Sequence, residues 1–332
     1  MKIEKKIGII GCGLIGWKRA KALKKKEILG CFDIDDLKSD NFSKFFNCRK
    51  YTKINDIIDN KEITIIFICT THKYLHQIAL EVLKKKKHIL IEKPGAINLP
   101  SLTLLKKKYK NKNIKLHIGY NHRYHPSILE AKRIIDKKKL GKVMYIRARY
   151  GHGARLKYHK EWRMNKKLSG GGELIDQGSH LIDLSRFFLG NLKLKYSKLK
   201  SYYWKTNSKV EDNAYLVLEN KNGCISFLHC SCTEWKNKFS FEIFCMKGKI
   251  EIRGLGGSYG MEKLILYKMK KKMGKPTIIT KTFPKNDNSW NLEVKNFFDT
   301  IDKKTKVVSD LNNAIENMKI INRSYKNYYD NN

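Results

Sequence analysis

The sequence predicts an α/β Rossmann domain built on a parallel sheet, followed by an α+β domain with a large, mostly antiparallel, open-faced sheet. Residues 6–121 alternate short β-branched runs with helical patterns, which is typical of parallel strands joined by crossover helices. The pattern changes from about residue 124, and from Leu192 to about Thr282 the strand-like runs follow one another directly, which indicates antiparallel pairing. We expect domains over 1–121 and 122–289, and C-terminal helices over 290–330 that pack back on the first domain.

Within the first domain, the strands are expected where β-branched residues cluster. They are Lys6–Ile10, Glu27–Asp33, a short Arg49–Tyr51, Ile63–Thr70, His88–Glu92 and Lys115–Tyr120. Apolar residues at three- and four-residue steps predict the helices Trp17–Lys25, Tyr74–Lys86 and Pro100–Tyr109.

In the second domain we expect a helix, a strand and a second helix before the run of strands begins. These are Pro126–Lys138, Val143–Tyr150 and Glu173–Leu189, and the strands then run from Leu192 to about Thr282. Two amphipathic helices are expected at the end, around Trp290–Ile301 and Leu311–Ile321, the latter capped by Ser309 or Asp310.

The net charge of +39 is the unusual feature of the composition. It is compatible with a nucleic-acid or anionic-membrane partner. Lysine blocks such as Lys84–Lys87 and Lys137–Lys139 fall near expected helix ends, however, without the interleaved aromatic residues of a strand-binding groove. We therefore expect no nucleic-acid partner and attribute the charge to a lysine-rich composition, although a positive field could attract an anionic substrate.

The eight cysteines are scattered and form no CxxC pair, so they are expected to be buried thiols in a reducing cytoplasm. The longest apolar run, Ile63–Cys69, is too short to span a bilayer, and the N-terminal residues lack a signal-peptide pattern. We expect a cytoplasmic protein without a membrane partner. His122, His152 and His159 lack the spacing of metal ligands, so no metal is expected.

A glycine-rich turn directly follows the first strand and opens the first helix. Its residues are Gly11, Gly13, Leu14, Ile15 and Gly16. In a βαβ unit, such glycines allow a tight turn, close approach of a pyrophosphate and close helix packing. Asp33 ends the second strand at the spacing of a carboxylate that binds the adenosine ribose. This favours NAD over NADP, and Lys38 leaves NADP open as a second cofactor.

Three side chains could carry chemistry. Lys93 follows a buried strand, at the edge where open α/β sheets bind ligands, and could polarise a substrate oxygen. Asp176 and His180 are four residues apart on an expected helix, and an imidazole suits proton exchange with an alcohol near neutral pH. Residue spacing alone also allows a solvated lysine and a surface Asp–His pair.

Trp162, Arg163 and Arg123 could contact substrate through stacking and anion pairing, or Trp162 could simply pack beneath a loop.

Taken together, these segments resemble the glucose–fructose oxidoreductase/inositol dehydrogenase/MocA family along nearly the whole chain. The motifs that carry the resemblance are the glycine turn, Glu92-Lys93-Pro94, Asn121-x-Arg123, Trp162-Arg163, Gly170-Gly171-Gly172, Asp176-x-x-x-His180, Val210-Glu211-Asp212-Asn213 and Gly256-Gly257-Ser258-Tyr259-Gly260-x-Glu262. Where many members have Thr-Pro-Asn, this chain has Thr70-Thr71-His72, with His76 in the later histidine position. Gly95 replaces the commoner leucine, and Gly95-Ala96 with the Gly-Gly-Ser-Tyr-Gly segment resembles a subgroup found with surface-glycan and nucleotide-sugar genes.

The resemblance implies a role for each site residue. His180 would be the general acid/base, Lys93 would hydrogen-bond the reacting oxygen, and Asp176 would position substrate and stabilise charge. It also implies a cis Lys93–Pro94 bond and a homodimer or homotetramer formed through the second-domain sheet. Beyond the glycine turn and Asp33, the cofactor contacts it implies are Thr70, Thr71, His76, Glu92, Lys93 and Asn121.

The sequence thus predicts an NAD-dependent oxidoreductase that acts on a secondary alcohol of a sugar or nucleotide sugar. Two alternatives stay open within the same family. The enzyme could use bound NAD as a transient oxidant for epimerisation, elimination or glycosidic cleavage, or the protein could bind NAD without catalysis. A nucleic-acid-binding protein is a third, for which the sequence offers no recognised module.

Overall fold

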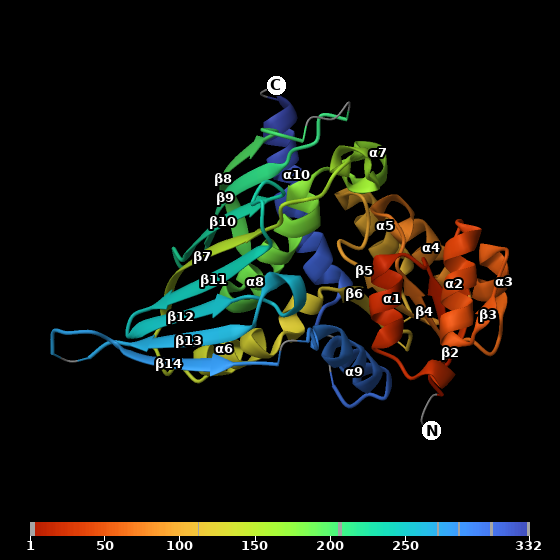
Figure 1. The fold of residues 1–332 in the computed structure, drawn as a ribbon, viewed down its shortest axis with the longest axis horizontal. Helices are drawn as coiled ribbons and strands as arrows, with labels where there is room; N and C mark the ends of the chain where they lie inside the picture. Colours follow the sequence, from red (N-terminus) through yellow and green to blue (C-terminus); the bar gives the residue numbers. More distant parts are fainter. Residues whose placement is uncertain are drawn as a thin grey trace. The chain divides into compact units, whose positions relative to one another are not determined.

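The computed structural model describes residues 4–111, 113–204, 208–270, 272–284, 286–305 and 308–330. The chain forms two compact units (Figure 1). The first comprises the residues up to Tyr120 together with Trp290–Ile315, and the second comprises Asn121–Ser289 and the residues from Glu316 onward.

The sheet of the first unit is parallel throughout, as the sequence predicts. Its strands lie in the order β3-β2-β1-β4-β5-β6. From β1 the strand order runs to β2 and β3 on one side, and from β4 it runs to β5 and β6 on the other. The order therefore reverses between β1 and β4, and sheets of this kind bind ligands at the carboxyl ends of the strands at this switch point. The strands are β1 (Ile7–Ile10), β2 (Ile28–Phe32), β3 (Arg49–Lys50), β4 (Ile65–Ile68), β5 (His88–Glu92) and β6 (Leu116–Gly119).

The helices of this unit include two that we did not expect. They are α2 (Asp36–Phe46) and α3 (Ile54–Asp59), in a segment where we expected only the short strand Arg49–Tyr51. Asp35 caps α2 by accepting a hydrogen bond from the Lys38 backbone N–H, and Phe42 and Phe46 anchor the helix in the core. The other helices are α1 (Leu14–Lys21), the 3₁₀ turn η1 (Lys25–Glu27), α4 (His72–Lys84), α5 (Leu99–Lys108) and α9 (Ser289–Ile301).

A buried charged cluster joins α1 to the sheet and to α9. Arg19 is fully buried, and its Nε lies 2.6 Å from Glu92 Oε1 at the end of β5. It also pairs with Glu293 of α9, which in turn accepts a 3.0 Å hydrogen bond from His117 Nε2 on β6. Since a buried charge must be paired, this cluster fixes the position of Glu92 and hence the turn that carries Lys93.

The second unit is built on the expected mostly antiparallel sheet. Its eight strands lie in the order β14-β13-β12-β11-β7-β10-β9-β8. The single parallel pair is β7 with β10, and the other neighbours are antiparallel. The strands are β7 (Val143–Gly151), β8 (Leu192–Lys200), β9 (Asn213–Asn220), β10 (Ile225–Ser231), β11 (Lys238–Cys245), β12 (Gly248–Arg253), β13 (Lys263–Lys268) and β14 (Thr277–Thr282).

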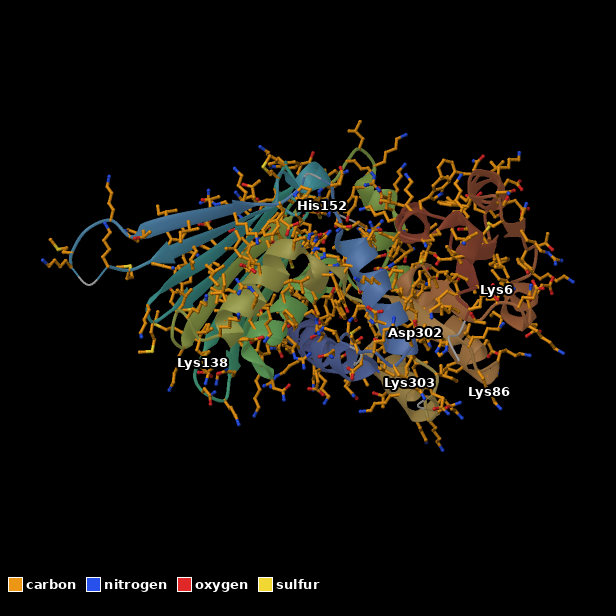
Figure 2. The ribbon with its side chains drawn as sticks, turned by 90° about the horizontal axis from the view of Figure 1, so that it is seen from below. Lys6, Lys86, Lys138, His152, Asp302 and Lys303 are labelled. Carbon is orange, nitrogen blue, oxygen red and sulfur yellow. The ribbon has the colours of Figure 1, made fainter. Side chains whose placement is uncertain are left out.

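Helices α6 (Pro126–Asp136) and α8 (Ser179–Leu189) pack on this sheet (Figures 1 and 2). The expected single helix Glu173–Leu189 instead begins with a π-helical turn, η5 (Leu174–Gly178), before α8. The glycine before α8 permits close packing there, because a Cβ on Gly178 would lie 2.9 Å from Cys230 Sγ of β10. The shorter elements are η2 (Asn121–Tyr124), η3 (Tyr158–Lys160), η4 (Trp162–Met164), α7 (Lys166–Ser169) and η6 (Gly257–Tyr259).

The two C-terminal helices differ in what they contact. We expected both to pack on the first domain, and α9 does so through Glu293 and the core residues Val294 and Phe297. Most of α10 (Leu311–Asp330) belongs to the second unit, because its Asn317 and Tyr325 hydrogen-bond polar groups buried there. No described helix combines the length and the apolar character that a membrane crossing requires.

Candidate active site

The glycine turn has the geometry that its spacing predicts. Gly11 has a φ of +101°, and a Cβ there would lie 2.6 Å from the Cys69 carbonyl group. A Cβ on Gly16 would lie 2.0 Å from the Gly11 carbonyl oxygen, so this glycine lets α1 approach β1 closely. A Cβ on Gly13 would instead meet open space within 4 Å. Gly13 is also the N-cap of α1, and no side chain caps this helix end.

Asp33 follows β2, and its carboxylate is fixed beside this turn. Oδ2 accepts a 2.7 Å hydrogen bond from the Cys12 backbone N–H, and Oδ1 accepts one of 2.9 Å from Asp35 N–H. Lys38, which we considered as a partner for a 2′-phosphate, lies 2.7 Å from Asp35 Oδ2. The hydrogen bond to Asp35 raises the pKa of Lys38.

These groups fit an NAD molecule. The uncapped N-terminus of α1 offers backbone donors and a favourable dipole, with open space at Gly13 for a pyrophosphate. The oriented carboxylate of Asp33 suits ribose hydroxyls and would repel a 2′-phosphate. Leu14, 67% exposed, and Ile15 form the first turn of the same helix.

The loop after β4 and the first turns of α4 add buried polar groups close to the switch point. Thr71 Oγ1 and His76 Nδ1 are buried and make no hydrogen bond with the described residues. Burial lowers the pKa of His76, which favours a neutral ring. Thr70 Oγ1 donates to the Thr71 carbonyl oxygen at 3.3 Å. Since buried polar atoms are normally paired, Thr71 and His76 are suited to contact a polar ligand.

Lys93 follows β5 directly and is half-buried. The Lys93–Pro94 peptide bond is cis, as the family resemblance implies. Glu92, an expected cofactor contact, accepts a 2.6 Å hydrogen bond from Arg19 Nε. Burial raises the pKa of Glu92, while the neighbouring Arg19 opposes that rise. The pair with Arg19 therefore helps to place the turn that carries Lys93, and a contact between Glu92 and the cofactor stays a prediction.

In the second unit, His180 lies in the first turn of α8 and is 4% exposed. Its ring stacks on that of His122, with centroids 3.8 Å apart and 23° between the planes. The ring of Tyr150, from β7, lies edge-on at 6.0 Å, and Tyr259 from η6 lies 5.2 Å from Tyr150. In the sequence, His122 was considered only as a metal ligand and Tyr259 only as part of a motif, and Tyr150 was not identified.

Asp176 lies in the π turn before α8, and its carboxylate is oriented by Arg163. Arg163 Nε donates to Asp176 Oδ2 at 3.1 Å, and its guanidinium lies 4.7 Å from the Trp162 ring centroid. Burial would lower the pKa of Arg163, but Asp176 and neighbouring acidic groups raise it overall. Arg163 thus contacts both Trp162, the other expected substrate residue of this segment, and the catalytic candidate Asp176.

A second acid–base pair was missed in the sequence. His152 Nε2, after β7, lies 3.4 Å from Glu173 Oε1, which also accepts a 3.1 Å hydrogen bond from Tyr158 Oη. Burial would lower the pKa of His152, but the Glu173 carboxylate raises it overall. Glu173 directly precedes the π turn. Its position three residues before the Asp176-x-x-x-His180 motif was the sequence signal that could have identified it.

Arg123 and Asn121 have partners within the second unit. Arg123 makes a buried two-point pair with Asp183 of α8, through Nε at 2.6 Å and an amino group at 2.7 Å. Asn121 Nδ2 donates to Ser289 Oγ at 2.8 Å. The pair with Asp183 gives Arg123 a structural role, and its contact with substrate stays a prediction. No group of three or more potential metal ligands gathers among the described residues.

Comparisons with known proteins agree with this architecture. Residues 5–120 match the family described as "Oxidoreductase family, NAD-binding Rossmann fold", and residues 128–251 match "GFO/IDH/MocA C-terminal domain". The fold is similar to that of levoglucosan dehydrogenase in complex with NADH and levoglucosan, with a TM-score of 0.86, 19% identity and coverage of 97% of each chain.

Similar sequences occur among enzymes that act on sugars and polyols. Glucose-6-phosphate 3-dehydrogenase of Bacillus subtilis (strain 168) is 34% identical over 188 residues, 54% of this chain and 52% of that protein. Myo-inositol 2-dehydrogenase of Thermotoga maritima is 24% identical over 191 residues, 56% of this chain and 55% of that protein. The match thus spans about half the length of these relatives. With an NAD-binding Rossmann domain and the matching C-terminal domain, the chain belongs to the GFO/IDH/MocA family of oxidoreductases.

Proposed function

We propose that this protein is an NAD-dependent dehydrogenase that acts on a secondary alcohol of a sugar or nucleotide sugar. The observation that carries the proposal is the environment of His180. This buried imidazole follows Asp176 by one turn, in a chain whose first unit presents Lys93 at a strand end. The sugar and polyol dehydrogenases among its relatives support the substrate class.

In the proposed mechanism, His180 removes the hydroxyl proton, because a neutral imidazole is a suitable base near neutral pH. Lys93 donates a hydrogen bond to the same oxygen and stabilises the negative charge that develops there. Asp176, oriented by Arg163, positions a neighbouring hydroxyl. Bound NAD supplies the acceptor for the hydride from the alcohol carbon. In the opposite direction, His180 returns the proton to the carbonyl oxygen.

The remaining assignments concern cofactor and substrate binding. We propose that the glycine turn, Asp33, Thr70, Thr71 and His76 bind NAD. Arg163 and Trp162 would then contact the sugar, by pairing with an anionic group and by stacking. A phosphorylated sugar is one substrate of this kind, as the name of the glucose-6-phosphate relative suggests.

A second candidate function is supported by the His152–Glu173 pair. An enzyme that used NAD as a transient oxidant for epimerisation or elimination would need a second proton acceptor. His152, held by Glu173, is such a group in the same unit as His180. This reaction would produce no net NADH.

We further propose a cytoplasmic homodimer or homotetramer formed through the face of the second-unit sheet. Exposed apolar side chains on neighbouring strands support this assembly. The rings of Tyr145 and Phe244 stack with their centroids 4.3 Å apart. On the neighbouring strand β10, the side chains of Ile225 and Phe227 are 43% and 46% exposed. All eight cysteines are free thiols, which suits a reducing compartment.

The experiment that tests the proposal is a panel of free sugars, sugar phosphates, and UDP- and GDP-sugars incubated with NAD. NADH absorbance reports oxidation, and product analysis reports any NADH-neutral conversion. We expect NADH to form with at least one sugar. Conversion of a sugar without NADH would support the transient-oxidant function, and NAD binding with no conversion of any kind would contradict both.

A further inference from the structure

The buried ring of His122 lies directly against the proposed acid/base. His122 is on η2 and 6% exposed, whereas His180 is on α8, so the two rings come from separate elements. Their 3.8 Å separation and 23° interplanar angle give a broad overlapping stack. Such a contact restricts rotation of the His180 ring about its side-chain bonds.

A chain of hydrogen bonds determines which nitrogen of His122 carries hydrogen. The Asp287 carboxylate only accepts, so Ser289 Oγ donates to it, at 2.6 Å. Ser289 Oγ must therefore accept the 2.8 Å hydrogen bond from Asn121 Nδ2. That places Asn121 Oδ1, an acceptor, toward His122, so His122 Nδ1 carries the hydrogen in their 3.2 Å contact.

Other titratable groups of this unit surround the pair. His125 lies edge-on to His122 at 5.4 Å, and its Nδ1 is 3.1 Å from Glu262 Oε2. Asp287 Oδ1 is 3.9 Å from His125 Nε2. Two carboxylates thus face the ring of His125. On the other side, Tyr150 lies 5.1 Å from His122, and Asp176 is in the turn preceding α8.

We propose that His122 is a positioning residue for His180, an inference that rests on the proposed acid/base role of His180. Its stacked ring holds the plane of the His180 imidazole, and the hydrogen-bond chain from Asp287 holds the ring of His122. The two imidazoles also titrate as a coupled pair, because a proton on one places a like charge against the other. His122 therefore makes His180 a weaker proton acceptor than it would be beside an uncharged ring.

The test uses the full-length protein with His122→Phe, which keeps an aromatic stack but cannot take a proton. We expect the pKa of His180, followed by NMR of the imidazole, to rise by at least about half a unit. The acidic limb of the kcat/KM profile should move to higher pH by a similar amount. His122→Ala, which removes the stack, should lower kcat about tenfold and leave KM and NAD affinity nearly unchanged.

His229 provides the matched control. Its ring also stacks on an aromatic ring, that of Tyr215, with centroids 4.4 Å apart and 6° between the planes. The same substitution there, His229→Phe, should leave the titration of His180 unchanged. If His122→Phe does not fold, His122→Gln also removes the titrating group and should raise the pKa of His180. An unchanged His180 pKa in the folded variant would overturn the inference. A raised pKa would support it even if His180→Ala kept full turnover, a result that would overturn only the proposed function.

Discussion

The hydroxyl of Tyr325 donates a 2.7 Å hydrogen bond to Glu211 Oε1, deep inside the second unit. The same oxygen accepts a 2.9 Å hydrogen bond from the Leu174 backbone N–H, and the carboxylate also accepts from Gly172 N–H. A Cβ on Gly172 would lie 1.9 Å from the Glu211 carbonyl oxygen. The triple glycine therefore allows the chain to fold around Glu211 and to place the turn that carries Asp176.

Glu211 should make stability depend on pH. Burial raises its pKa from 4.5 to about 7, in spite of the hydrogen bonds that lower it. The folded protein then holds this proton more tightly than the unfolded chain does. The stabilising contribution is thus full below pH 4.5 and is lost as the pH rises to about 7. Thermal unfolding of wild type and Glu211→Gln from pH 4.5 to 8 checks this. The wild type should lose stability relative to the variant as the pH rises, and parallel curves would contradict the assignment.

Substitutions at two glycines of the turn, Gly13 and Gly16, should separate cofactor binding from folding. Gly13→Ala adds a methyl group in open space, so the melting temperature should stay within about 2 °C while NAD affinity falls about tenfold or more. Gly16→Ala places its methyl group against the Gly11 carbonyl oxygen and should destabilise the fold by about 1–3 kcal/mol. Calorimetry measures the stability of each variant, and NADH fluorescence titration measures its cofactor affinity. Equal loss of stability in the two variants would show that Gly13 has no specific role in cofactor binding.

Asp33 should determine cofactor choice. Asp33→Ser removes the carboxylate and should weaken NAD binding about tenfold to a hundredfold, by loss of charged hydrogen bonds. Because repulsion of a 2′-phosphate is also removed, NADP affinity should rise relative to NAD. The control is Asp36→Ser, which removes a carboxylate whose ion pair with Lys50 lies on the surface of α2. An unchanged ratio of NAD to NADP affinity in Asp33→Ser would rule out this role.

The buried charge cluster should dominate the stability of the first unit. Glu293→Ala leaves Arg19 with only Glu92 as its carboxylate partner in this cluster and should cost about 3–5 kcal/mol. Glu81→Ala removes an exposed pair with Lys84 and should cost less than about 1 kcal/mol. Urea unfolding compares them, and similar losses for both variants would be inconsistent with a buried cluster that holds the unit together.

Much of the fold could be predicted because its signals are local. The strands β1, β4 and β5 are short apolar runs, and the glycine turn has a fixed spacing after a strand. Helices α2 and α3 were missed because α2 is mostly polar and exposes Leu37, while α3 spans only six residues. The π turn was missed because an i,i+4 pattern does not distinguish it from an α-helix.

The missed site features depend on contacts between distant segments. Arg19 lies in a lysine-rich stretch, and only Glu92 and Glu293 explain why it is buried. His122 and His180 are 58 residues apart, so no sequence pattern could show their stack. Residue type and motif resemblance led to Lys93, Asp176 and His180 as catalytic candidates, whose roles stay a prediction. The groups that contact Asp176 and His180 could be identified only from the fold.

The proposed dehydrogenase mechanism is tested most directly by comparing turnover with cofactor binding in His180→Ala and Lys93→Ala. The substrate is the sugar that proves active in the panel, and His159→Ala, which alters an exposed imidazole, is the control. We expect both variants to bind NAD within about twofold of wild type and to lose at least about a hundredfold in kcat. Normal turnover in His180→Ala would contradict the role of His180 as the general acid/base.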